Sequence, residues 1–146
     1  SNLGIKPIRG QMLLLKGPPF KVRHITLADD RFIIPRKDGH VLIGSTIEDI
    51  GFNKSTSKSV QEQLLDYACR TIPGLSKYSL EHHWSGLRPG LESNTPIICR
   101  HPTLNNLYIN SGHYRNGLVL APASARLLCE IMLRTTTSLP ETDYAL

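Results

Sequence analysis

Arg88 lies in the segment WSGLRPG (84–90), where its surroundings favour a fixed and uncrowded side chain. Gly86 precedes it and the turn-forming pair Pro89-Gly90 follows it, so we expect Arg88 at the end of a strand. A guanidinium group binds a carboxylate through two parallel hydrogen bonds, which fix both its position and its tilt. The pattern therefore indicates a carboxylate clamp, although a surface arginine beside a turn would give the same signature.

The segment GHYRNG (112–117) is the second place where we expect chemistry. Gly112 and Gly117 allow unusual backbone angles and the close approach of a ligand. The backbone N–H groups of Asn116, Gly117 and Leu118 are expected near the start of a helix, where such donors suit an anionic group. Taken alone, the segment also fits an ordinary turn bracketed by glycines.

The elements that must position these two segments follow from hydrophobic patterning. Strands are expected at 10–15, 21–27, 31–35, 40–46, 78–87, 96–99 and 106–111. Helices are expected at 57–71 and 122–134. The order of the elements predicts an α+β fold with a largely antiparallel mixed β-sheet and two main helices on one face.

The ends of the helices carry their own signals. Ser59 and Glu62 fit a capping box for the first helix, and Pro122 suits the first turn of the second. The chain after Thr135 is expected to be frayed.

Bulk composition narrows the class of protein. The 146 residues are 40% hydrophobic and 20% charged, as in an ordinary folded domain. The 17 Lys and Arg residues are dispersed, so the net charge of +5 predicts no nucleic-acid binding. No apolar run approaches the roughly 20 residues of a membrane helix, and no residues have metal-ligand spacing, so neither a membrane span nor a metal is expected.

The sequence carries no complete catalytic apparatus. No GxGxxG, P-loop or GxSxG motif occurs, and no residue is identified as catalytic with certainty. Cys69, Cys99 and Cys129 lie far apart in apolar segments, which predicts buried reduced thiols and a cytoplasmic protein.

Three segments nevertheless closely resemble one family, in their order and their spacing. They are FIIPRKDGHVLIGST (32–46), WSGLRPG (84–90) and SGHYRNGLVLAP (111–122). The family is the glycine oxidases, the thiamine-pathway members of the FAD-dependent D-amino-acid oxidase superfamily, and PIRGQ (7–11) fits it too. The resemblance runs from about residue 7 to residue 134.

This resemblance implies an oxidoreductase that converts glycine or another small amino acid or amine to an imine. The imine becomes a 2-oxo acid, and dioxygen is reduced to hydrogen peroxide. The resemblance also implies that the chain forms a single domain, with residues 7–100 as a substrate-binding sheet. Residues 106–134 would be a strand, loop and helix that return to the flavin, and the FAD-binding Rossmann half would lie outside this chain.

The resemblance assigns roles to individual residues. Arg88, Arg115 and Phe32 are expected to bind the substrate. Flavin contacts are expected from Gly112, His113, Arg115, Asn116, Gly117 and Leu118. His113 fits a packing role as well.

Phe32 departs from the family pattern, because the glycine oxidases that this chain resembles usually carry Tyr at this place. A missing hydrogen bond to a charged group is worth about 1.5–3 kcal/mol. The preference for glycine is therefore open, with Tyr114 and Tyr78 as candidates to supply the missing hydroxyl.

Two alternatives stay open. One is another amine oxidase or dehydrogenase of the superfamily, of the D-amino-acid, sarcosine or proline type. The other is a non-catalytic module of the same fold that binds a small carboxylate or a protein. The expected partners are a small amino acid and the missing FAD half, and a homo-oligomer stays open.

We expect this chain alone to be inactive and to hold no FAD. We also expect an apolar surface around residues 112–118, where the missing half would dock.

Overall fold

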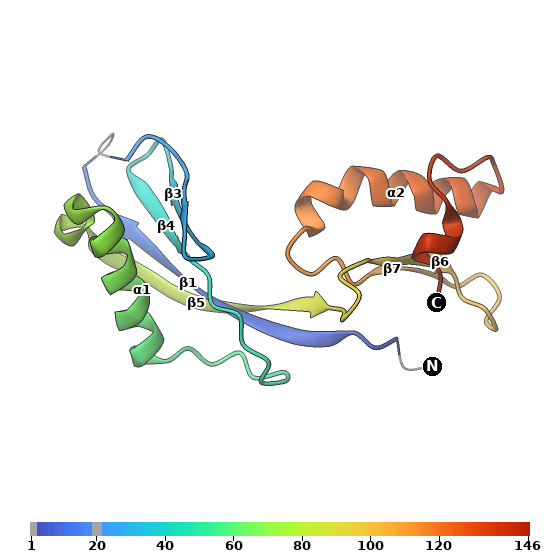
Figure 1. Ribbon diagram of the computed structural model, residues 1–146, viewed down its shortest axis with the longest axis horizontal. Helices are drawn as coiled ribbons and strands as arrows, with labels where there is room; N and C mark the ends of the chain where they lie inside the picture. Colours follow the sequence, from blue (N-terminus) through green and yellow to red (C-terminus); the bar gives the residue numbers. More distant parts are fainter. Residues whose placement is uncertain (1–2, 19–21) are drawn as a thin grey trace. The chain divides into compact units, whose positions relative to one another are not determined.

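The computed structural model describes residues 3–18 and 22–146 (Figure 1). The chain divides into two compact units, one formed by Arg9–Leu87 and the other by Ser1–Ile8 together with Arg88–Leu146. Two long strands, β1 (Lys6–Lys16) and β5 (Ser79–Gly90), contribute residues to both units.

The larger sheet has five strands in the order β2-β3-β4-β1-β5. Its three shorter strands are β2 (Thr26–Ala28), β3 (Arg31–Pro35) and β4 (His40–Gly44). β2 pairs antiparallel with β3, β3 with β4, and β4 with β1, which is the expected meander. The strand expected at 21–27 is shorter, and its first residue lies outside the described residues.

One face of this sheet packs against helix α1 (Lys58–Thr71). The sheet contributes Leu13, Leu15, Ile33, Val41 and Ile43, and the helix contributes Leu64, Tyr67 and Ala68. Each fully buried aliphatic side chain stabilises the fold by about 1.5–3 kcal/mol relative to exposure. Because side chains alternate along a strand, the residues between these core positions lie on the opposite face of the sheet.

The N-cap of helix α1 lies two residues earlier than the capping box predicted. Ser57 is the N-cap, with extended backbone angles, and its hydroxyl accepts a hydrogen bond from the Val60 N–H at 3.3 Å. The prediction of Ser59 as the cap was wrong, because Ser59 already lies inside the first turn.

The second unit holds a two-stranded antiparallel sheet and a long helix. The strands are β6 (Ile97–Arg100) and β7 (Tyr108–Ser111), and helix α2 (Gly117–Leu133) packs on both. Helix α2 starts five residues before Pro122, so the prediction of Pro122 in the first turn was wrong. A proline this close to the start removes only one early backbone hydrogen bond, which lets the helix extend back to the loop.

The C-terminal segment is anchored, and the expectation of a frayed tail was wrong. The Glu130 carboxylate accepts hydrogen bonds from the backbone N–H and the hydroxyl of Ser138, both at 2.8 Å. Beyond it, the short 3₁₀ helix η2 (Glu141–Tyr144) contacts β6. An acidic side chain near the end of α2 thus holds the chain that follows.

The α+β class and the antiparallel pairing are confirmed. The described strands divide into two sheets, and each main helix packs on its own sheet. β6 and β7 pair with each other, and residues 101–107 connect them. Cys99 is buried and Cys69 is partly buried, but Cys129 is exposed, so the expected burial was wrong for Cys129.

Candidate active site

Arg88 lies near the end of β5 and is half-buried. The strand continues through Pro89-Gly90, two residues further than the arginine. Burial lowers the pKa of the Arg88 guanidinium from its ordinary value, the nearby Tyr114 raises it, and the nearby Arg115 lowers it further. Charge interactions weaken quickly with distance, so these three side chains share one neighbourhood.

The loop that carries Tyr114 and Arg115 is bonded directly to the segment that carries Arg88. The Tyr114 N–H donates to the carbonyl oxygen of Pro89 at 3.1 Å. Tyr114 itself has φ of 50°, in the left-handed region that few non-glycine residues adopt. The structure therefore brings together the two segments that the sequence singled out, within one compact unit.

Gly112 is required by this arrangement. Its φ is 86°, and a Cβ placed on it would lie 2.2 Å from Leu91 Cδ1. Side chains rarely adopt this backbone angle, and a Cβ here would require the Leu91 side chain to move. Glycine therefore lets the loop take this path without strain.

The loop ends at the N-terminus of α2. Asn116 is the N-cap, and its side chain makes no capping hydrogen bond. Its own N–H donates to the His113 carbonyl at 2.9 Å, so of the three predicted backbone donors this one is already used. Gly117 and Leu118 occupy the first two helical positions, where N–H groups have no partner within the helix.

The first turn of α2 presents an apolar surface. Leu118 is 91% exposed and Val119 is 81% exposed. The expected apolar exposure near residues 112–118 is confirmed. Such side chains on a helix start are typical of a contact surface.

His113 has a structural contact. Its Nε2 lies 2.9 Å from the hydroxyl oxygen of Ser124, which is buried inside α2. This contact ties the loop to the helix, and a flavin contact by His113 stays a prediction.

Phe32 belongs to the unit formed by Arg9–Leu87. It is half-buried on β3, between Arg31 and the core residue Ile33. Since Ile33 faces α1, Phe32 faces away from that helix. Its pairing partner on β4 is Gly44, which in turn pairs with Met12 on β1, so Phe32 and Met12 share a face across a glycine.

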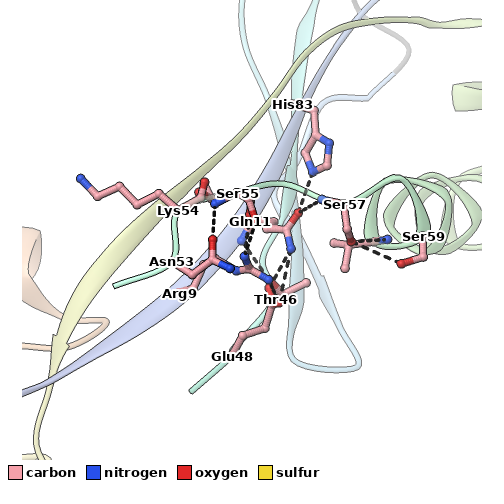
Figure 2. Close-up of polar contacts among 12 residues, drawn as sticks. Arg9, Gln11, Thr46, Glu48, Asn53, Lys54, Ser55, Ser57, Ser59 and His83 are labelled. Carbon is pink, nitrogen blue, oxygen red and sulfur yellow. Dashed lines mark hydrogen bonds and ion pairs between the residues drawn. The ribbon is translucent and has the colours of Figure 1, made fainter. Parts of the chain in front are cut away.

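Sequence reasoning missed a group of interacting polar side chains that we call the polar cluster (Figure 2). It consists of Arg9, Gln11, Thr46, Glu48 and His83. Gln11 is fully buried and Arg9 is 7% exposed. The segment PIRGQ (7–11) carried a signal for this cluster. Arg9 and Gln11 lie two residues apart, directly before the apolar residues 12–15, so both side chains point to the same face of the strand.

The Glu48 carboxylate is the centre of the polar cluster. Burial raises its pKa, but hydrogen bonds from Arg9, Thr46 and Gln11 outweigh burial and leave the pKa of Glu48 below its ordinary value. Its carboxylate is therefore ionised at neutral pH. The Nε atom of Arg9 is buried without a hydrogen-bond partner among the described residues.

Within residues 3–18 and 22–146, no helix has the length and apolar character to cross a membrane. In the same part of the chain, no group of three or more His, Cys, Asp or Glu side chains could hold a metal ion.

Comparison with known proteins identifies the class of protein to which this chain belongs. The family model described as FAD dependent oxidoreductase matches residues 1–131. The chain therefore belongs to the FAD dependent oxidoreductase family.

Individual relatives agree with this family. The chain is 43% identical over 144 residues to the glycine oxidase of Pseudomonas aeruginosa (strain PAO1), covering 99% of this chain and 40% of that protein. It is 32% identical over 136 residues to the bifunctional protein ThiO/ThiG of Synechocystis, covering 90% of this chain and 21% of that protein.

A solved structure of a glycine oxidase also resembles this chain. The crystal structure of glycine oxidase from Geobacillus kaustophilus matches with a TM-score of 0.93 and 27% identity. The match covers 99% of this chain and 40% of that structure. The chain thus spans about two fifths of the length of the glycine oxidases it matches.

Proposed function

We propose that this chain is the substrate-side part of an FAD-dependent oxidase of small amino acids or amines that bear a carboxylate, with glycine as the first candidate. The observation that carries this proposal is the hydrogen bond from the Tyr114 N–H to the Pro89 carbonyl at 3.1 Å, which joins the loop that carries Arg115 to the segment that carries Arg88. The Arg88 guanidinium is half-buried there, and the nearby Arg115 contributes to the lowering of its pKa.

Two adjacent cations favour an anion between or beside them. Like charges in a partly desolvated site repel, and a bound carboxylate would relieve that repulsion through charge-assisted hydrogen bonds. Arg88 would hold the carboxylate in a two-point contact, which sets the orientation of the adjoining Cα. Arg115 is exposed on the loop that also carries Tyr114, and it would supply the second positive charge.

The residues of the loop and the helix start fit a flavin. Gly112 leaves no side chain between the loop and the end of β5, and Gly117 and Leu118 carry N–H groups at the positive end of the α2 dipole. These donors suit the side of a flavin ring where negative charge develops. Arg115 and Asn116 lie in the same turn and are proposed as additional contacts.

Bound FAD would supply the hydride acceptor for oxidation of the substrate Cα–N bond. The residues of this chain would bind the carboxylate, orient the Cα and stabilise negative charge with backbone donors, so that no strong general base is needed for an amine that is already neutral. The product is an imine, which water converts to a 2-oxo acid, and dioxygen would become hydrogen peroxide. These steps belong to the whole protein.

Phe32 is proposed to contact the substrate through an apolar ring, without the hydroxyl that a tyrosine would carry. The Tyr78 hydroxyl donates to the carbonyl of Pro18 at 2.8 Å and is engaged there. Tyr114, which acts on Arg88 electrostatically, is therefore the better candidate for the missing hydrogen bond.

The setting of the proposed enzyme is the cytoplasm, supported by three free cysteines. A place in thiamine biosynthesis is supported by the likeness to the bifunctional ThiO/ThiG protein.

The test is a substrate panel on the whole flavin-containing protein with peroxide detection. Each amino acid is paired with the amine that lacks its carboxylate, such as glycine with methylamine. We expect peroxide from glycine, sarcosine or another small amino acid and none from its paired amine. Equal turnover of both members of a pair, or no turnover of any amino acid, would contradict the proposal.

A further inference from the structure

The Glu48 carboxylate is the shared acceptor of the polar cluster (Figure 2). It receives the Nη2 donor of Arg9 and the hydroxyl of Thr46, both in short contacts. It also receives the Nε2 donor of Gln11, at 3.0 Å to Oε1. One negative charge therefore satisfies three donors, and removing it would leave all three without their acceptor.

The orientation of the Gln11 amide follows from this contact. Because its Nε2 donates to Glu48, its Oε1 must accept, and it receives the Ser57 N–H at 3.1 Å. The same oxygen lies 3.0 Å from His83 Nε2, which must then carry a proton. A single buried side chain on β1 thus connects β5, the N-cap of α1 and the segment that contains Glu48.

The segment held in this way is the connection between β4 and α1, residues 45–57. It has no helix or extended strand of its own, only an isolated bridge between Glu48 and Arg9. Its path is set by side chains, since Arg9 Nη1 donates to the Ser55 carbonyl at 2.6 Å. The hydroxyl of Ser85 donates to the Lys54 carbonyl in a short contact.

The start of this segment lies beside Phe32. Gly44 pairs with both Phe32 and Met12, but Glu48 pairs with Arg9, so the register along β1 shifts by one residue after Gly44. The shift is a bulge, and Thr46 stabilises it by accepting the Gln11 N–H on its hydroxyl at 2.8 Å. A bulge redirects the chain and the side chains that follow it.

We propose that Glu48 is a positioning residue for substrate binding, which holds the bulge after β4 and thereby the chain that adjoins Phe32. This inference rests on the proposed function, in which Phe32 contacts the substrate. Such a contact acts on the ground state and the transition state alike, so its loss changes KM and leaves kcat in place.

The experiment uses the whole flavin-containing protein with Glu48→Gln, which keeps the shape of the side chain and removes its charge. We expect KM for the best amino acid to rise about tenfold, with kcat within about twofold and FAD per chain unchanged. The matched control is Glu62→Gln, the same change on an exposed side chain of α1, which should leave KM unaltered.

A second, milder variant is Thr46→Val, which keeps the branched shape and deletes the hydroxyl at the bulge. It should raise KM about two- to threefold without changing kcat, and it decides the question if Glu48→Gln does not fold. A KM equal to that of the unaltered protein in the folded variants overturns the inference, as does a fall confined to kcat or FAD content. An unaltered protein that oxidises no amino acid overturns the proposed function instead, and with it the basis of this inference.

Discussion

The polar cluster and the neighbourhood of Arg88 both gather charged groups, but they differ in the charge that acts on the arginine. Arg9 forms an ion pair with the carboxylate of Glu48, which also accepts hydrogen bonds from Gln11 and Thr46. Arg88 lies near a second arginine, Arg115. We propose that these two arginines bind an anion, whereas the ion pair of Arg9 with Glu48 stabilises the fold.

Substitution of matched arginines should separate the two regions most strongly. Arg9→Met leaves the Glu48 carboxylate without its charged partner, and breaking such a pair costs about 3 kcal/mol of unfolding free energy. Arg115→Met should change that free energy by less than about 0.5 kcal/mol, because Arg115 is exposed and most surface substitutions have small effects. Urea unfolding of the whole protein measures both.

Kinetics of the same two variants complete the comparison. Arg115→Met should raise KM for the amino acid about tenfold, as expected for a weakened carboxylate site. A large stability loss in Arg115→Met, or none in Arg9→Met, would show that the two regions have been assigned the wrong way round.

Gly112→Ala tests whether the loop depends on close approach. The new Cβ would meet Leu91 at 2.2 Å, and the backbone would need a strained angle. Together these should cost about 2 kcal/mol or more. Gly51→Ala is the control, because Gly51 has φ of 66° but no atom within 4 Å of the added Cβ, so only the backbone strain of about 1 kcal/mol applies.

Thermal unfolding and FAD content should be followed for both glycine variants. Gly112→Ala should lose flavin as well as stability, and Gly51→Ala should lose stability alone. Equal behaviour of the two variants would argue that space at the loop has no special importance.

Ser57→Ala tests the smaller contribution of the helix cap beside the polar cluster. Loss of the bond from the Val60 N–H should cost about 1 kcal/mol of unfolding free energy. Ser59→Ala, at the position that the sequence pattern favoured, should cost less than about 0.3 kcal/mol. A larger loss of unfolding free energy in Ser59→Ala than in Ser57→Ala would show that Ser59 is the N-cap.

The pH dependence of stability is the finest test of the polar cluster. Burial lowers the pKa of His83 below 6.5, its ordinary value. The folded state thus favours neutral His83, and its contribution is fully present above pH 6.5 and declines as the pH falls through the lowered pKa. His83→Gln should therefore show a shallower fall in stability between pH 7 and pH 5, measured by urea unfolding in the same buffers.

Local pattern was enough to predict most of the elements and to single out the two segments that the structure brings together, around Arg88 and around Tyr114. Alternation and turn residues placed the strands of the meander and helix α1, and glycines near Arg88 and Arg115 marked the loops that meet. These features are local, because they depend on side-chain period and on backbone freedom within a few residues.

What the sequence did not reveal depends on pairing between distant segments. The polar cluster joins Arg9 and Gln11 of β1 to side chains far along the chain, those of Glu48 and His83. Glu48 and Gln11 look like ordinary polar residues until the strands bring them together. Helix α2 was placed late because a proline inside the helix resembles a helix start.

The central claim is that Arg88 binds the carboxylate of the substrate. The most direct measurement compares Arg88→Ala with Arg36→Ala, an exposed arginine of the β3–β4 turn, in the whole flavin-containing protein. We predict that Arg88→Ala raises KM for the amino acid by about 100-fold or more while FAD content stays at the unaltered level, and that Arg36→Ala changes neither. An unchanged KM in a folded, flavin-loaded Arg88→Ala protein would contradict the account.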